Sequence, residues 1–223
     1  MKTIYTIACF LLTTVVQSQN PIEIPIPQFS TIKVFDLMTV NLIKSTENKI
    51  VITGRDAQDV EYVLKNDLLK VRMKTDKIFD GVQTFVQVHY TQVDVIDSNE
   101  GATITSNELI KQAQLSIMVQ EGARVKVGLE VDNLKLRAVS GGIIEASGMA
   151  TFQDVTVNTG GIIENHKLIT DHTTVKVQAG GEVEVHATQS IDASVRAGGD
   201  VSVSGSPKRV TQKTLFGGRI TIK

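Results

Sequence analysis

The stretch GGIIEASGMATFQDVTVNTGG, residues 141–161, is one unit of a repeat that runs through the second half of the chain. Its glycine pair recurs at steps of 19, 20, 18 and 19 residues, and Gly122-Ala123 and Gly101-Ala102 extend the series upstream. A fixed period of this length is typical of a solenoid, in which stacked repeats bury what one repeat cannot bury alone. The predicted turn glycines are Gly101, Gly122, Gly141, Gly142, Gly160, Gly161, Gly180, Gly181, Gly198, Gly199, Gly217 and Gly218.

The residues that flank each glycine alternate between apolar and polar, with a period of two. This alternation predicts strands with one face inward, because successive side chains of a strand point to opposite sides. β-Branched residues fill the inward columns, for example Ile144, Ile163 and Val183, each three residues after a first glycine. Glycine suits the corner because it takes positive φ without steric cost. The sequence therefore predicts an all-β parallel β-helix with two short strands and about 19 residues per coil.

The rest of the chain divides by composition into a signal, a leader and an irregular β region. Residues 1–19 are predicted to be a signal peptide, and residues 20–28 an extended, proline-containing leader. Residues 29–95 are predicted to form irregular β structure that caps the solenoid or a small separate β-domain, with a short helix or turn from 56 to 65. Regular coils follow over residues 96–223, and the last coil has polar Gln212 and Thr214 in its inward columns, as a terminal cap would.

The composition excludes several classes of function. The formal net charge is −1, which does not favour a nucleic-acid partner. The only cysteine, Cys9, lies within the predicted signal, so the mature chain is expected to contain no disulfide and no thiol nucleophile. No later segment is long and apolar enough for a transmembrane helix. No phosphate loop, nucleophile motif or metalloprotease motif occurs, and no cofactor is expected.

Several short segments, taken in order, resemble one known family. They are Phe29-Ser30-Thr31-Ile32-Lys33-Val34, Thr39-Val40-Asn41-Leu42, Ile50-Val51-Ile52-Thr53-Gly54, Gly205-Ser206-Pro207 and Phe216-Gly217-Gly218-Arg219-Ile220. Together they resemble the auto-transporter adhesin head GIN domain family of secreted bacterial proteins, over about residues 29–223. The resemblance implies a right-handed, single-stranded parallel β-helix, export to the periplasm or cell surface, and an adhesin-like role without catalysis.

Outward residues also fall into columns, and one group of them is a candidate metal site. Glu164 and Glu184 lie four residues after their glycines, and His166 and His186 lie six residues after them. On neighbouring strands these four side chains would form a two-by-two patch that could bind zinc. The simpler interpretation is a solvated charged face, because a flat sheet surrounds an ion poorly.

Three apolar or buried positions in the coils also need an explanation. Ile143 and Ile162 share an outward column. They are part of a partner surface, or they are covered by an adjacent loop or simply exposed without a role. Asn165 occupies an inward column, where a buried amide would hydrogen-bond the backbone of a turn and fix its shape.

The function favoured by the sequence is an exported, non-catalytic, adhesin-like binding or structural module. Its expected partner is a cell-surface glycan or a matrix protein, and a homo-oligomer is left open. One alternative is a polysaccharide lyase or hydrolase on a β-helix scaffold, although the coils are too uniform in length to wall a groove with loops. A periplasmic scaffold subunit is the third hypothesis.

Overall fold

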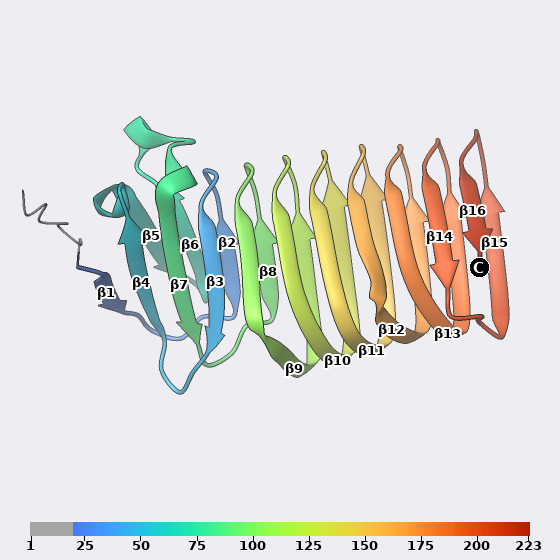
Figure 1. The fold of residues 1–223 in the computed structure, drawn as a ribbon, viewed down its shortest axis with the longest axis horizontal. Helices are drawn as coiled ribbons and strands as arrows, with labels where there is room; N and C mark the ends of the chain where they lie inside the picture. Colours follow the sequence, from blue (N-terminus) through green and yellow to red (C-terminus); the bar gives the residue numbers. More distant parts are fainter. Residues whose placement is uncertain (1–19) are drawn as a thin grey trace, which may run out of the picture.

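The structure is a computed structural model that describes residues 20–223, so the predicted signal peptide lies outside the described residues. The strands form one continuous sheet, wound into a flattened rod (Figure 1). The fold prediction is confirmed: the chain is a β-solenoid of about 7 turns with roughly 19 residues per coil. The chain descends the front of the rod, ascends the back and advances toward the C-terminus, so the coil is right-handed (Figure 1).

Most coils are built from one long bent strand and not from the two short strands that were expected. The strand continues around the lower bend, and only the glycine turn at the upper edge interrupts it (Figure 1). The long strands are β9 (Thr103–Val119), β10 (Arg124–Val139), β11 (Ile143–Asn158), β12 (Ile162–Val177) and β13 (Glu182–Val195). Each pairs in parallel with the next. We call the strand halves that follow a turn the front face, and those that precede the next turn the back face.

The core fills the narrow space between these two faces. The inward columns predicted from the sequence are buried through six coils; Ile104, Ile144 and Val183, for example, are at most 1% exposed. Their β-branched side chains stack on like residues of the next coil, and burying one such side chain contributes about 1.5–3 kcal/mol. All coils therefore share one continuous hydrophobic core.

The two glycines of a pair have different structural roles. In the turn after β10, Ser140 and Gly141 both have positive φ, 49° and 74°, and Gly142 N donates to Val139 O at 2.9 Å. This geometry matches the type I′ hairpin turn, which favours glycine at its second central position. Gly142 is needed for a different reason, because a Cβ there would lie 2.7 Å from the backbone of Val119 in the neighbouring coil.

The N-terminal strands extend both faces of the rod, but not in sequence order. The front face continues β9–β3–β7–β4–β1, and the back face β9–β8–β2–β6–β5. The unit that β2 and β3 form thus lies between the β8–β9 coil and the β6–β7 unit. Its turn, Asp36-Leu37, takes positive φ without glycine. The bounds are β1 (Ile22–Pro25), β2 (Thr31–Val34), β3 (Thr39–Lys44), β4 (Lys49–Gly54), β5 (Val60–Lys65), β6 (Leu68–Met73), β7 (Thr84–Tyr90) and β8 (Val95–Ser98).

Antiparallel strands cover the N-terminal end of the parallel rod. β4 pairs antiparallel with β7, and β5 pairs antiparallel with β6. Of the short helix or turn expected from 56 to 65, only a turn is present: a single 3₁₀ turn, η1 (Ala57–Asp59), leads directly into β5, and residues 60–65 are strand. Sheet pairing with β6 prevails over the helical spacing of a few apolar residues. Two further 3₁₀ turns, η2 (Thr75–Lys77) and η3 (Gly81–Gln83), precede β7.

The C-terminal coil consists of β14 (Asp200–Ser204), β15 (Arg209–Thr214) and β16 (Arg219–Ile222). The expected polar residues, Gln212 and Thr214, are exposed, as is all of β15. The coil is nevertheless less polar than expected, because Phe216 and Leu215 beside them are also exposed. Within residues 20–223, the structure contains no helix of the length and apolarity that a membrane crossing requires.

Candidate functional site

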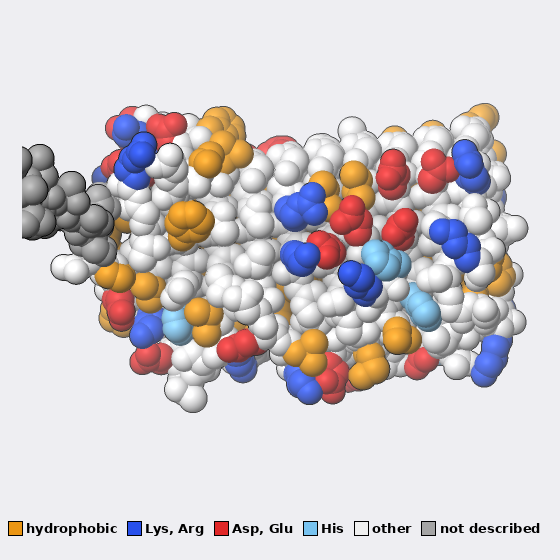
Figure 2. Space-filling view, viewed as in Figure 1, with side chains coloured by type: hydrophobic (Ala, Val, Ile, Leu, Met, Phe, Trp, Pro, Cys, Tyr) orange, Lys and Arg blue, Asp and Glu red, His pale blue; other side chains and the backbone are white. Residues whose placement is uncertain are grey.

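The front face carries a ladder of charges that largely compensate one another. Figure 2 shows basic and acidic side chains gathered next to one another on this face. Lys126 Nζ lies 2.8 Å from Glu145 Oε1, and Arg124 Nη1 lies 3.9 Å from Glu164 Oε2. Glu164 is in turn aligned with Glu184 on the next strand. These side chains are substantially exposed, so each pair contributes little to stability. The front face therefore presents a mixed-charge surface whose cations are largely paired with acids.

The predicted patch of Glu164, His166, Glu184 and His186 does not assemble as a two-by-two group. His166 Nδ1 lies 3.1 Å from Glu184 Oε2. A register shift after Asn165 then aligns His186 with Ile169 and not with His166. Three extra residues of β12 bulge out of the pairing at this point. Equal distance from the preceding glycine therefore no longer places His166 and His186 side by side. Among residues 20–223, no three His, Cys, Asp or Glu side chains are placed to hold a metal ion.

Asn165 lies where the front-face strand begins to bulge. It is fully buried, and its Oδ1 accepts a hydrogen bond from the backbone N–H of Ala146 at 2.9 Å. The expected hydrogen bond to backbone is present, but its partner lies within β11 and not in a turn. The bond satisfies an N–H that the register shift between Glu145 and Ser147 removes from the regular ladder.

The outward column of Ile143 and Ile162 is aligned as the sequence predicted. Both side chains are half-buried, and Glu182 and Asp200 continue the column on the next strands. At its end Arg219 Nε lies 3.3 Å from Asp200 Oδ1. The isoleucines are thus too covered to form an open apolar patch.

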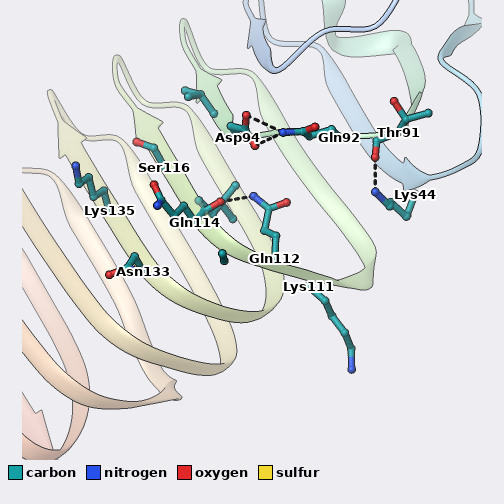
Figure 3. A pocket seen from close by; sticks show the side chains of 13 residues that line it. Lys44, Thr91, Gln92, Asp94, Lys111, Gln112, Gln114, Ser116, Asn133 and Lys135 are labelled. Carbon is teal, nitrogen blue, oxygen red and sulfur yellow. Dashed lines mark hydrogen bonds between the residues drawn. The ribbon is translucent and has the colours of Figure 1, made fainter.

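The back face contains a polar groove of about 700 Å³ that the sequence did not reveal (Figure 3). One wall is the connection from β7 to β8, and the other is the ascending half of β9 together with β10. We call this space the groove, and its polar lining residues are Lys44, Thr91, Gln92, Asp94, Lys111, Gln112, Gln114, Ser116, Asn133 and Lys135.

Hydrogen bonds fix the connection that forms the first wall. Asn48 Oδ1 accepts from both the backbone N–H and the hydroxyl of Thr91, at 2.9 and 3.2 Å. Gln112 Nε2 donates to Val93 O at 2.9 Å and so ties this wall to β9. Lys44 Nζ donates to Thr91 O and lies 5.4 Å from the ring centroid of Tyr90, and burial raises the pKa of Tyr90. The groove is therefore a preformed feature of the rod.

The groove offers hydrogen-bonding groups and positive charge. Lys111 extends away from the others (Figure 3), and its Nζ lies 2.6 Å from Glu130 Oε2. Lys135 forms no ion pair within residues 20–223. Asp94, the only acid among the described residues of the lining, accepts two hydrogen bonds from Gln92 at 3.0 and 3.1 Å. Among the described residues, the side chains that line the groove offer amides, hydroxyls, lysines and one carboxylate.

A column of outward side chains leads from the groove along the back face. We call this column the back ladder; in order along the rod it comprises Gln114, Asn133, Phe152, His172, Ser190 and Arg209. The rings of Phe152 and His172 stack with centroids 5.1 Å apart and planes at 20°. His172 Nδ1 lies 2.9 Å from Ser190 Oγ.

A signal for the back ladder is present in the sequence but was missed. Each of its six residues lies eight positions before the first glycine of the following turn. Counting forward from the preceding glycine gives His172 no aligned partner. Counting backward from the following glycine places His172 in the same column as Phe152 and Ser190.

Comparison with known proteins places the chain in a family. A family model described as putative auto-transporter adhesin, head GIN domain, matches residues 28–207. The chain belongs to this family. Among curated proteins, no relative matches significantly.

Solved structures share the fold of this head GIN domain protein at low sequence identity. A putative adhesin from Bacteroides fragilis has a TM-score of 0.83 and 19% identity, over 92% of this chain and 96% of the other. One from Parabacteroides distasonis has a TM-score of 0.75 and 20% identity, over 93% and 98%. A putative lipid binding protein from Parabacteroides distasonis has a TM-score of 0.69 and 16% identity, over 93% and 98%. At these identities the likeness shows a common fold, and the family match indicates an adhesin-like module.

Proposed function

We propose that this head GIN domain protein is an exported adhesin-like module that binds a glycan at the cell surface through the groove. The observation that carries the proposal is the polar, preformed groove with its amide groups and with Lys135, which forms no ion pair in the described part of the chain. Sugar hydroxyls need several hydrogen-bonding partners at once, and amides supply donors and acceptors on one planar group. Lys135 favours a glycan that carries carboxylates.

The composition of the groove favours binding over hydrolysis of a glycan. Glycoside hydrolysis ordinarily uses two carboxyl groups, separated by about 5–9.5 Å, on either side of the scissile bond. Asp94 is the only carboxylate that the described residues contribute to the lining, and Gln92 already hydrogen-bonds it. The lipid-binding name of one structural relative suggests another ligand, but amides and lysine suit an acyl chain poorly.

A glycan array tests the binding role with a matched pair of variants. The wild-type mature chain is expected to bind a subset of glycans enriched in uronic acids. Lys135→Gln combined with Gln114→Ala should abolish that binding, because both residues line the groove. Lys126→Gln on the front face is the control and should bind as the wild type does. Wild-type binding to no glycan, or equal binding by the groove variant, would overturn the proposal.

Export and surface location need a separate measurement. Antibody labelling of intact cells should detect the protein as strongly as labelling of permeabilised cells. Labelling only after permeabilisation would place the protein inside the envelope and favour the scaffold hypothesis.

A further inference from the structure

We infer that the ligand is an extended, linear carbohydrate chain that lies along the rod, from the groove over the aromatic pair of the back ladder. This inference rests on the proposed function and adds the direction, length and second contact region of the glycan. It assigns Phe152 and His172 as sugar-packing residues.

The alignment of the back ladder makes such a track physically continuous. From Gln114 to His172, three successive strand pairings carry the ladder without a register shift among its members. Gln114 and Asn133 line the groove, and Phe152 is the next residue on the same line. Five strand spacings separate Gln114 from Arg209, about 24 Å in all. A ligand confined to the groove would leave most of this line unused.

The aromatic pair supplies the contact that amides cannot. Phe152 is 50% exposed although it lies among polar neighbours, Asn133 before it and Ser190 beyond His172. The contact between its ring and His172 holds it in place, so little side-chain entropy remains to be lost on binding. Pyranose rings present C–H groups that pack against aromatic surface, while their hydroxyls bond to adjacent amides. The succession of amide, aromatic and hydroxyl groups along the back ladder therefore fits a saccharide chain.

A lipid or membrane surface fits this line less well. Met149 and Ile169, three residues before Phe152 and His172, are exposed at the lower bend and add apolar surface there. The back ladder itself, however, is interrupted by polar groups at every position except Phe152, whereas membrane-binding surfaces need a contiguous apolar face. Vesicle binding is accordingly an outcome that would count against the inference.

The test uses immobilised linear oligosaccharides, from disaccharides to decasaccharides, in neutral and uronic-acid series. For the wild type, affinity should rise with chain length beyond what the groove can hold. Phe152→Ser should weaken binding of the longest oligosaccharides about five- to tenfold and leave the shortest bound ligands unchanged. Phe152→Tyr should retain binding. Phe85→Ser is the matched control, because Phe85 is 53% exposed but lies on the front face in β7.

The possible failures are distinguishable. If no series binds the wild type, the proposed function fails and the inference with it. If short and long oligosaccharides bind equally and Phe152→Ser has no effect, only the inference fails. Phe152-dependent binding to phosphatidylcholine–phosphatidylglycerol vesicles, without glycan binding, would overturn both in favour of a lipid ligand. Circular dichroism of Phe152→Ser verifies that the rod is folded.

Discussion

The front and back faces of the rod are built from the same strands but differ in register and chemistry. On the front face, register shifts interrupt the pairing after Lys126, Glu145 and Asn165, and the charged side chains form ion pairs with one another. On the back face, the alignment from Gln114 to His172 runs on without a break, and its amides and aromatic rings remain open. A further shift, between Thr170 and His172, precedes the ladder position in the β12–β13 pairing. The difference teaches that a solenoid can absorb most of the variation in coil length away from one column of side chains and so keep that column aligned.

The largest expected effect comes from the turn that joins the two faces. In Gly161→Ala, the new Cβ would lie 2.3 Å from the carbonyl oxygen of Ala138 in the neighbouring coil, so the coils would have to separate. The free energy of unfolding should fall by about 3 kcal/mol or more, measured by chemical denaturation. In Gly160→Ala, an added Cβ meets nothing within 4 Å, and only the positive φ of 72° is unfavourable, at about 1–2 kcal/mol. Equal losses in the two variants would contradict the separate roles of the paired glycines.

A smaller effect is expected from the bulge that sets the front face apart. Asn165→Val removes the acceptor of the buried Ala146 N–H and should cost about 1–3 kcal/mol. Asn107→Val, at an exposed amide of β9, should change the free energy of unfolding by less than about 0.5 kcal/mol. Glycan binding by Asn165→Val should persist, because the back ladder does not pass through this residue. A variant as stable as the wild type would show that the bulge does not depend on this hydrogen bond.

The turns between the faces also predict a pH dependence of stability. Burial, followed by the charge of Asp36, raises the pKa of Glu100 above its ordinary value of 4.5. A raised folded-state pKa of an acid means stability that is present below the unfolded-state pKa and is lost as pH rises through the folded-state value. Glu100→Gln should therefore be more stable than the wild type at neutral pH. Thermal melts at acid and neutral pH measure the difference, which should shrink in acid; a destabilised variant at neutral pH would refute this assignment.

The smallest effect is expected from the ion pairs of the front face. Lys126→Gln breaks a pair in which the lysine side chain is 61% exposed and that of Glu145 is 28% exposed. The loss of unfolding free energy should be below about 1 kcal/mol and should disappear at high salt. A larger loss that salt does not reduce would mean that the front face contributes to stability more than its exposure suggests.

The sequence predicted the rod well because its glycine period and inward β-branched columns follow directly from strand stacking. Ile144 and Ile163 could be placed by counting from a glycine, since no bulge lies between them and the turn. His166 and His186 could not, because the register shift after Asn165 changes their alignment. The groove could not be predicted from the sequence either. Its wall at Thr91 is held by Asn48, 43 residues earlier in the chain, and the β2–β3 unit is stacked out of sequence order.

Isothermal titration calorimetry with the longest oligosaccharide that binds the wild type would test the distinction between the faces most directly. The back-face variant combines Gln114→Ala with Phe152→Ser, and the front-face variant combines Lys126→Gln with Glu164→Gln. The back-face variant is expected to bind at least about tenfold more weakly than the wild type, and the front-face variant to match the wild type. Loss of binding in the front-face variant with full binding in the back-face variant would contradict the account.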